Sequence, residues 1–128
     1  MVGYEKRNVN PKNKKTGDCV IRALTTAMEQ PYEVVRDELF ELMKKTGYSM
    51  TSKQNYEKYL KQKGWIKHKQ PRRPDGSKYK VAEIDKFIAP NERAVISIAN
   101  HLTATEDGKI IDLWDCRQYT ILNFYTKG

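Results

Sequence analysis

Two cysteines and two histidines are the residues of this 128-residue chain best suited to nucleophilic chemistry. Cys19 lies between Gly17-Asp18 and an apolar run, where the pattern predicts the first turn of a helix. Unpaired amide groups and the helix dipole stabilise a thiolate at that position, so they lower the pKa of a cysteine from about 8.5. Cys19 is therefore the expected nucleophile, whereas Cys116 follows a charged residue without an obvious base and is expected to be a bystander.

A nucleophilic thiol needs a histidine as its base. His68 lies between lysines in the most basic stretch of the chain, whereas His101 begins an expected strand directly after residues 93–100. The dipeptide Asp107-Gly108 is the preferred pair for a two-residue hairpin turn, and this turn sets the register of the strands on either side. His101 is the better candidate because the hairpin also supplies a carboxylate.

The expected hairpin register brings His101 and Asp112 together. Side chains alternate between the two faces of a strand, so His101 and Asp112 become diagonal neighbours on one face, and Asp115 points to the other. A carboxylate that orients an imidazole facing a thiol is the Cys-His-Asp arrangement of thiol hydrolases. The structural alternative for each residue taken singly is a packed histidine on a strand and an aspartate near a turn.

Other roles for the cysteines are less favoured. The N-terminal residues contain no apolar stretch of signal-peptide type, so we expect a cytoplasmic protein whose thiols stay reduced rather than a Cys19–Cys116 disulfide. The cysteines and histidines lack the close spacing of zinc ligands, so we expect no metal site. Neither a phosphate-binding loop nor a dinucleotide fingerprint occurs, and we expect no cofactor.

The elements that must position these residues change type along the chain. Apolar periodicity predicts a first helix from Asp18 or Cys19, a second between Pro31 and Gly47, and a third between Ser52 and Gly64. Expected strands cover residues 65–70, 93–100, the hairpin around 107–108, and 119–126. This order predicts an α+β fold in which N-terminal helices pack on a C-terminal antiparallel sheet, in a single domain over residues 1–128.

The net charge of +8 is concentrated in two segments. Residues 1–15 and residues 61–80 hold five and eight basic residues against one acidic residue each. Clustered basic charge is typical of chains that bind nucleic acid or an acidic protein surface, although it also serves solubility. The candidate polyanion-binding residues are Lys67, Lys69, Arg72 and Arg73. No apolar run is long enough to span a bilayer, so we expect no membrane partner.

The segment Gly17-Asp18-Cys19-Val20-Ile21-Arg22-Ala23-Leu24 resembles the nucleophile segment of ovarian-tumour-domain deubiquitinases. The order of the cysteine, histidine and aspartate along the chain is similar to that of the papain-like cysteine peptidase superfamily. The chain as a whole resembles the small papain-like proteins of bacteriophages and prophages. This resemblance implies a papain-like fold and a thiol protease with Cys19 as nucleophile, His101 as base and Asp112 as orienter. It also makes Asn13 a candidate oxyanion donor, because papain has a glutamine six residues before its cysteine.

Two functions are therefore expected from the sequence. The first is a papain-like thiol hydrolase that cleaves an amide or isopeptide bond in a protein or peptide substrate. The alternative is a papain-fold binding protein without catalysis, which uses its basic loop at 61–80 to bind nucleic acid or an acidic host protein. The pH dependence of thiol reactivity distinguishes the two.

Overall fold

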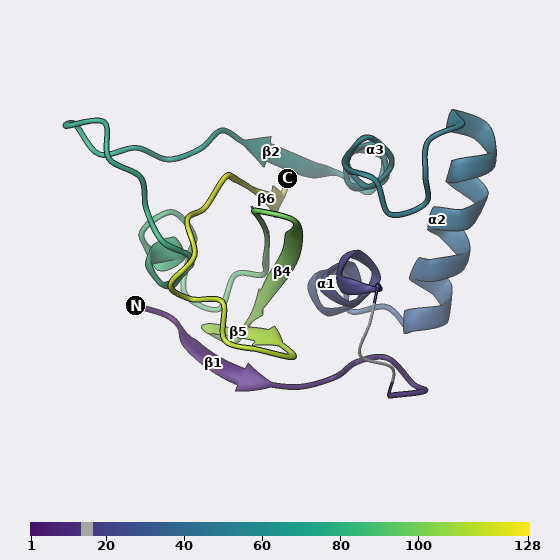
Figure 1. Cartoon of the computed structure of the whole chain (residues 1–128), viewed down its shortest axis with the longest axis horizontal. Coiled ribbons are helices and arrows are strands. Elements are labelled where there is room, and N and C mark those ends of the chain that lie inside the picture. Colours follow the sequence, from purple (N-terminus) through teal and green to yellow (C-terminus); the bar gives the residue numbers. More distant parts are fainter. Residues whose placement is uncertain (14–16) are drawn as a thin grey trace.

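A computed structural model describes residues 1–13 and 17–128 and shows an α+β fold (Figure 1). Lys14 and Lys15 of the N-terminal basic segment lie outside the described residues. The three α-helices lie together on one side of a six-stranded sheet. No helix among the described residues has the length and apolar character needed to cross a membrane.

The helices occupy the regions predicted by the apolar periodicity. They are α1 (Cys19–Met28), α2 (Tyr32–Thr46) and α3 (Lys53–Gln62). Pro31 occupies the N-cap of α2, and Gly47 ends that helix with φ 77° while its amide donates to the Met43 carbonyl. The Ser52 side chain accepts a hydrogen bond from the Asn55 amide and caps α3. A short 3-10 helix, η1 (Val81–Lys86), lies between β2 and β3.

The sheet is mixed, which corrects the prediction of a purely antiparallel sheet. Its strands lie in the order β1-β5-β4-β3-β6-β2. Their bounds are β1 (Gly3–Lys6), β2 (Trp65–His68), β3 (Ala94–Ile98), β4 (His101–Glu106), β5 (Lys109–Asp112) and β6 (Asn123–Lys127). The four-residue strand β1 pairs parallel with β5 at the sheet edge. Its short sequence of glycine, tyrosine and charged residues gives no alternating apolar signal, which explains why it was not predicted.

The last expected strand is wrong in its first half, because β6 begins only at Asn123. Tyr119 and Ile121 have backbone partners outside the sheet. The Val81 amide donates to the Tyr119 carbonyl, and the Ile121 amide donates to the Tyr79 carbonyl, both at 2.9 Å. The β-branched and aromatic side chains of this segment therefore lie against the residues that lead into η1, and they do not extend the strand.

Two hydrophobic clusters cover the two faces of the sheet. Alternate residues of β3 belong to different clusters, because Val95 packs with the three helices and Ile96 packs with the side of η1. Both residues are completely buried. The strand is thus apolar on both faces, and it anchors the β3–β4 turn from which the candidate site is built.

Candidate active site

Helix α1 begins at Cys19, so the thiol lies in its first turn as the sequence predicts. Asp18 occupies the N-cap position but makes no capping hydrogen bond with its side chain. The backbone amides of the first turn have no acceptor within the helix, and they give this end of α1 a partial positive charge. The fold therefore places the cysteine where a thiolate is stabilised.

His101 is held beside Cys19 by the tight turn between β3 and β4. In this turn Ile98 pairs with His101, and Asn100 adopts a left-handed conformation with φ 55°. Cys19, His101 and Leu102 line the same pocket, and the imidazole and the backbone amide of Leu102 both lower the pKa of the Cys19 thiol. The start of helix α1 and the start of strand β4 thus meet at one thiol.

Asp112 completes the arrangement from the end of β5. Its Oδ2 lies 2.7 Å from Nε2 of His101 and its side chain is only 3% exposed. The β4–β5 register pairs Glu106 with Lys109, as expected for a turn at Asp107-Gly108. Because Nε2 faces the carboxylate, the other ring nitrogen of His101 is the one available to the thiol.

Asp115 and His68 lie away from this group. Asp115 pairs with Arg117 at 2.8 Å near the surface. His68 hydrogen-bonds Thr126 at 2.7 Å and stacks on Phe124. The structure therefore gives Asp115 and His68 other partners, and Asp115 lies beyond the end of β5, where the strand register no longer determines its side.

The environment of Cys19 favours its thiolate. Burial raises the pKa of the thiol, but hydrogen bonds from His101 and Leu102, together with the charges of His101 and Arg22, outweigh burial and lower it. Burial also lowers the pKa of His101, whereas Asp112 and Cys19 stabilise its charged form and raise the pKa to about 9. These opposite shifts favour a thiolate–imidazolium pair near neutral pH.

A buried ionic network that was not recognised from the sequence supports the aspartate. Arg22 Nε lies 2.8 Å from Asp18 Oδ1, and Arg22 Nη1 lies 3.2 Å from Asp112 Oδ1. The amide of Asn10 and the hydroxyl of Tyr32 donate to Asp18 Oδ2 at 2.8 and 3.0 Å. The available signal was the spacing of Asp18 and Arg22, which are four residues apart beside the predicted nucleophile.

Cys116 lies close to the same aspartate but has the opposite chemistry. It is completely buried, and its sulfur lies 3.9 Å from Asp112 Oδ2. Burial and the negative charge of Asp112 raise the pKa of this thiol to about 12. Both cysteines are free thiols, and Cys116 is a poor nucleophile at neutral pH.

Potential metal-ligand atoms of three side chains lie within 4.8 Å of one another, in His101, Asp112 and Cys116. The sequence spacing gave no indication of a metal site. The donor set does not suit a cation. Asp112 Oδ1 already accepts hydrogen bonds from Arg22 and the Leu113 amide, and Oδ2 faces His101. A cation would also meet the guanidinium charge of Arg22, so these residues fit a hydrogen-bonded network better than a metal centre.

Cys19 and His101 open onto a pocket of about 400 Å³. The walls come from the starts of α1 and α3, the β3–β4 turn and the segment before β6. The other residues that line it are Gly17, Val20, Thr51, Lys53, Tyr56, Ser97, Ile98, Asn100, Leu102 and Leu122. A small group can therefore reach the thiol from solvent.

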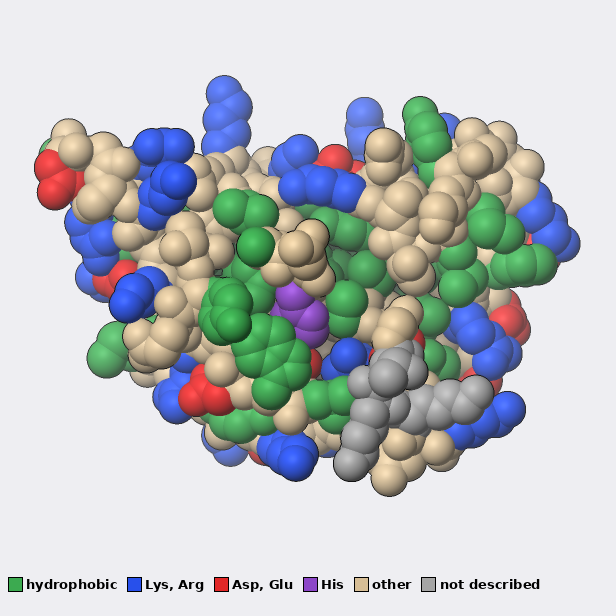
Figure 2. All heavy atoms as spheres, in the orientation of Figure 1, with side chains coloured by type: hydrophobic (Ala, Val, Ile, Leu, Met, Phe, Trp, Pro, Cys, Tyr) green, Lys and Arg blue, Asp and Glu red, His purple; other side chains and the backbone are tan. Residues whose placement is uncertain are grey.

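Aromatic side chains flank the imidazole on the surface. The ring of Trp114 lies 4.9 Å from that of His101, and Tyr119 lies 5.1 Å beyond it. Trp114 is 39% exposed, so it is not part of the hydrophobic core. Its ring lies beside the imidazole and shields it from solvent. Figure 2 shows hydrophobic side chains gathered around a histidine on the face of the molecule that it presents.

The structure does not bring Asn13 to this pocket. Asn13 is exposed, is not among the lining residues, and accepts a hydrogen bond from Asn8 at 3.2 Å. The nearby Asn10 donates a hydrogen bond to Asp18 at 2.8 Å. The backbone amide of Cys19 is therefore a better oxyanion donor than either asparagine side chain.

Two of the four candidate polyanion-binding residues are engaged within the fold. Lys67 pairs with Glu57 at 2.8 Å. Arg73 pairs with Glu83 at 2.6 Å and lies over the ring of Tyr79 at 4.1 Å. Arg72 and Lys69 are exposed, and Arg72 bonds only neutral oxygens in the described part of the chain. The basic loop therefore presents less free positive charge than its composition indicates.

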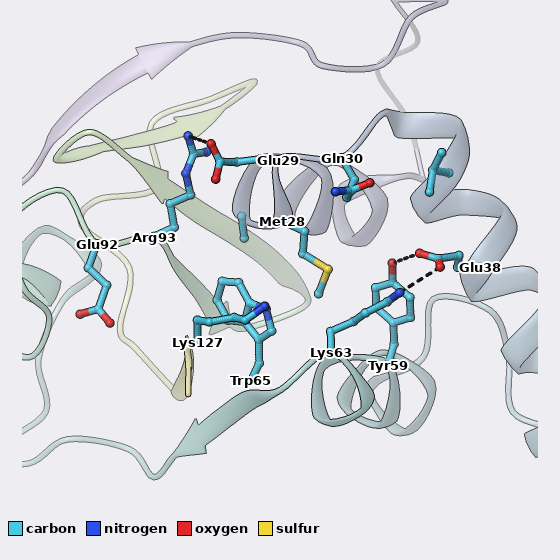
Figure 3. Close-up of a pocket in the computed structure, with 12 residues that line it drawn as sticks. Met28, Glu29, Gln30, Glu38, Tyr59, Lys63, Trp65, Glu92, Arg93 and Lys127 are labelled. Carbon is cyan, nitrogen blue, oxygen red and sulfur yellow. Dashed lines mark hydrogen bonds and ion pairs between the residues drawn. The ribbon is translucent and has the colours of Figure 1, made fainter.

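A larger pocket of about 630 Å³ lies at the opposite end of α1, where Figure 3 shows Met28 and Trp65 beside it. Most of its charged rim is paired within the protein. Arg93 bonds Glu29 at 3.0 Å, and Glu38 accepts from both Tyr59 and Lys63 (Figure 3). No cysteine or histidine is among the described residues that line it, so the candidate nucleophile and base lie at the smaller pocket.

Comparison of the chain with protein-family models, with curated proteins and with solved structures finds no match.

Proposed function

We propose that the chain is a papain-like thiol hydrolase that cleaves an amide or isopeptide bond in a protein or peptide. The observation that carries this proposal is the grouping of three side chains at a pocket: Asp112 hydrogen-bonds His101 at 2.7 Å, and His101 lines the pocket with Cys19 and lowers the pKa of its thiol. Its order along the chain and its elements, a cysteine at a helix start and a histidine and aspartate on adjacent strands, resemble the papain-like arrangement.

The first half of the reaction is acyl transfer to the thiol. The Cys19 thiolate attacks the carbonyl carbon, and the carbonyl electrons move to oxygen to form a tetrahedral intermediate. The backbone amide of Cys19 supplies a hydrogen bond to that oxygen. As the intermediate collapses, the C–N bond breaks, His101 gives its proton to the leaving nitrogen, and a thioester remains on Cys19.

The second half returns the enzyme to its starting state. Neutral His101 takes a proton from water, and the resulting hydroxide attacks the thioester carbonyl. The C–S bond then breaks, which releases the carboxylic acid and restores the thiolate–imidazolium pair. Asp112 keeps the imidazole oriented and stabilises its charged form in both halves.

Alkylation by iodoacetamide tests the activated thiol directly. Because the pKa of Cys19 is lowered and that of Cys116 is raised to about 12, we expect Cys19 to be labelled rapidly below about pH 8 and Cys116 to remain unlabelled. Mass spectrometry of the two cysteine-containing peptides over a pH series measures both rates. The His101→Ala variant is the matched control, and we expect its Cys19 rate to fall at neutral pH. Slow labelling of Cys19 in the native chain at neutral pH would contradict the proposal and favour the binding protein.

A further inference from the structure

The pocket beside Cys19 has an unbalanced charge. None of the described residues that line it is acidic, and Lys53 is the only lysine or arginine among them. The thiolate and the imidazolium of the candidate site neutralise each other. The positive charge of Lys53 therefore remains after the site itself has been accounted for.

Lys53 is held in place by a neutral partner. It is the first residue of α3, and its Nζ lies 2.8 Å from Oδ1 of Asn123. Asn123 is buried on β6, where it pairs with Ser97, a residue that lines the pocket. An amide oxygen orients the ammonium group without cancelling its charge, so Lys53 can still pair with an anion.

The nearest carboxylate on the same helix is occupied. Glu57 lies one turn beyond Lys53, and the charge of Lys53 is among the causes that lower its pKa. The hydrogen-bonding partners of Glu57 are Lys67 at 2.8 Å and the Tyr125 hydroxyl at 2.5 Å. Lys53 is exposed, so an anion can reach its ammonium group from solvent. Apolar side chains form much of the remaining pocket wall and can contact the apolar part of a bound group.

We propose that Lys53 forms an anion subsite and that the substrate of Cys19 carries a carboxylate close to the bond that is cleaved. The carboxylate would pair with the Lys53 ammonium while an adjacent apolar group fills the space bounded by Val20, Ile98 and Leu122. The subsite thereby selects acidic over neutral substrates. This inference rests on the proposed function for the reaction at the thiol.

Two alkylating reagents that differ in charge test the subsite. Iodoacetate and iodoacetamide react in the same way, since the Cys19 sulfur bonds the methylene carbon and iodide leaves, but only iodoacetate carries a carboxylate. We expect Lys53→Gln to lower the ratio of the iodoacetate rate to the iodoacetamide rate at Cys19 several-fold. The attraction of His101 for iodoacetate is present in every variant compared, so the change in the ratio reports on Lys53 alone.

Two further variants keep the test specific. Lys61→Gln removes an exposed charge from the same helix, away from the pocket lining, and we expect the native ratio. Lys53→Arg keeps the charge, and we expect it to retain most of the preference for iodoacetate. An unchanged ratio in Lys53→Gln would overturn the anion subsite. Slow reaction of native Cys19 with iodoacetamide would instead overturn the proposed function, so the two failures are distinguishable.

Discussion

Asp112 is the residue on which the interactions of the site converge. It contacts His101 through one oxygen and Arg22 through the other, and its charge also raises the pKa of Cys116. Burial alone would raise the pKa of Asp112, but the hydrogen bond from His101 is among the interactions that lower it, so the group stays ionised. One carboxylate therefore favours the charged histidine and keeps the second cysteine protonated.

Replacing Asp112 by asparagine should remove the negative charge beside His101 while keeping the size and shape of the side chain. We expect Asp112→Asn to fold, because the amide fills the same space, and to lower the pKa of His101 from about 9 toward its ordinary value of 6.5. In this variant the His101 imidazolium loses its proton at a lower pH than in the native chain. At neutral pH the Cys19 thiolate then lacks its charged partner, so alkylation should slow several-fold. An NMR titration of the His101 ring measures the shift. Asp115→Asn is the control, because Asp115 bonds Arg117 instead, and an unshifted His101 in Asp112→Asn would contradict the assignment.

At the scale of elements, one arginine joins the helix that begins at Cys19 to the strand that ends at Asp112. Arg22 lies on α1 and reaches both Asp18 beside that helix and Asp112 at the end of β5. All three side chains are at most 10% exposed. Removal of one member of such a network leaves buried charges without a partner, which costs more than the network contributes when intact.

The variant Arg22→Met should therefore destabilise the fold by about 3–5 kcal/mol at pH 7. The pKa values of Asp18 and Asp112 are lowered in the native chain, so their contribution to stability is present above their ordinary value of 3.8 and is lost as pH falls through the folded values. The difference between variant and native chain should therefore shrink under acidic conditions. Urea unfolding at pH 7 and at a pH well below 3.8 measures it.

Arg36→Met is the matched control for this prediction. Arg36 pairs with Asp37 at 3.2 Å on the surface of α2. Exposed ion pairs contribute about 0–1 kcal/mol, so this variant should stay close to the native chain at both pH values. Equal losses in the two variants would mean that Arg22 acts as an ordinary surface arginine.

For the whole molecule, the sequence predicted the contacts that depend on local periodicity. The helices follow from apolar spacing, and the meeting of His101 with Asp112 follows from the two-residue turn at Asp107-Gly108. Strand β1 was not predicted because four residues paired at a sheet edge leave almost no pattern. Lys53 was not predicted because its place in the pocket depends on how α3 packs beside β6, which no local spacing determines.

Charge at the scale of the whole molecule separates the enzyme from the alternative binding protein. A protein that binds nucleic acid through its basic loop should bind a DNA duplex at about 50 mM salt and lose affinity steeply as salt rises. In that case Lys69→Ala/Arg72→Ala should weaken binding and flatten its salt dependence more than Lys67→Ala/Arg73→Ala, because Lys67 and Arg73 are already paired within the fold. Fluorescence anisotropy measures both. Absence of binding at that salt would assign the charge to solubility.

The two-residue turn between β4 and β5 also limits where insertions can be accepted in this chain during evolution. Both turn residues adopt left-handed conformations, with φ 51° at Asp107 and 75° at Gly108. One residue inserted there would move Asp112 to the other face of the sheet and away from His101. Insertions in the exposed loop at 69–80 would leave that pairing untouched. Related chains that keep this chemistry should therefore vary in length at the loop and not at the turn.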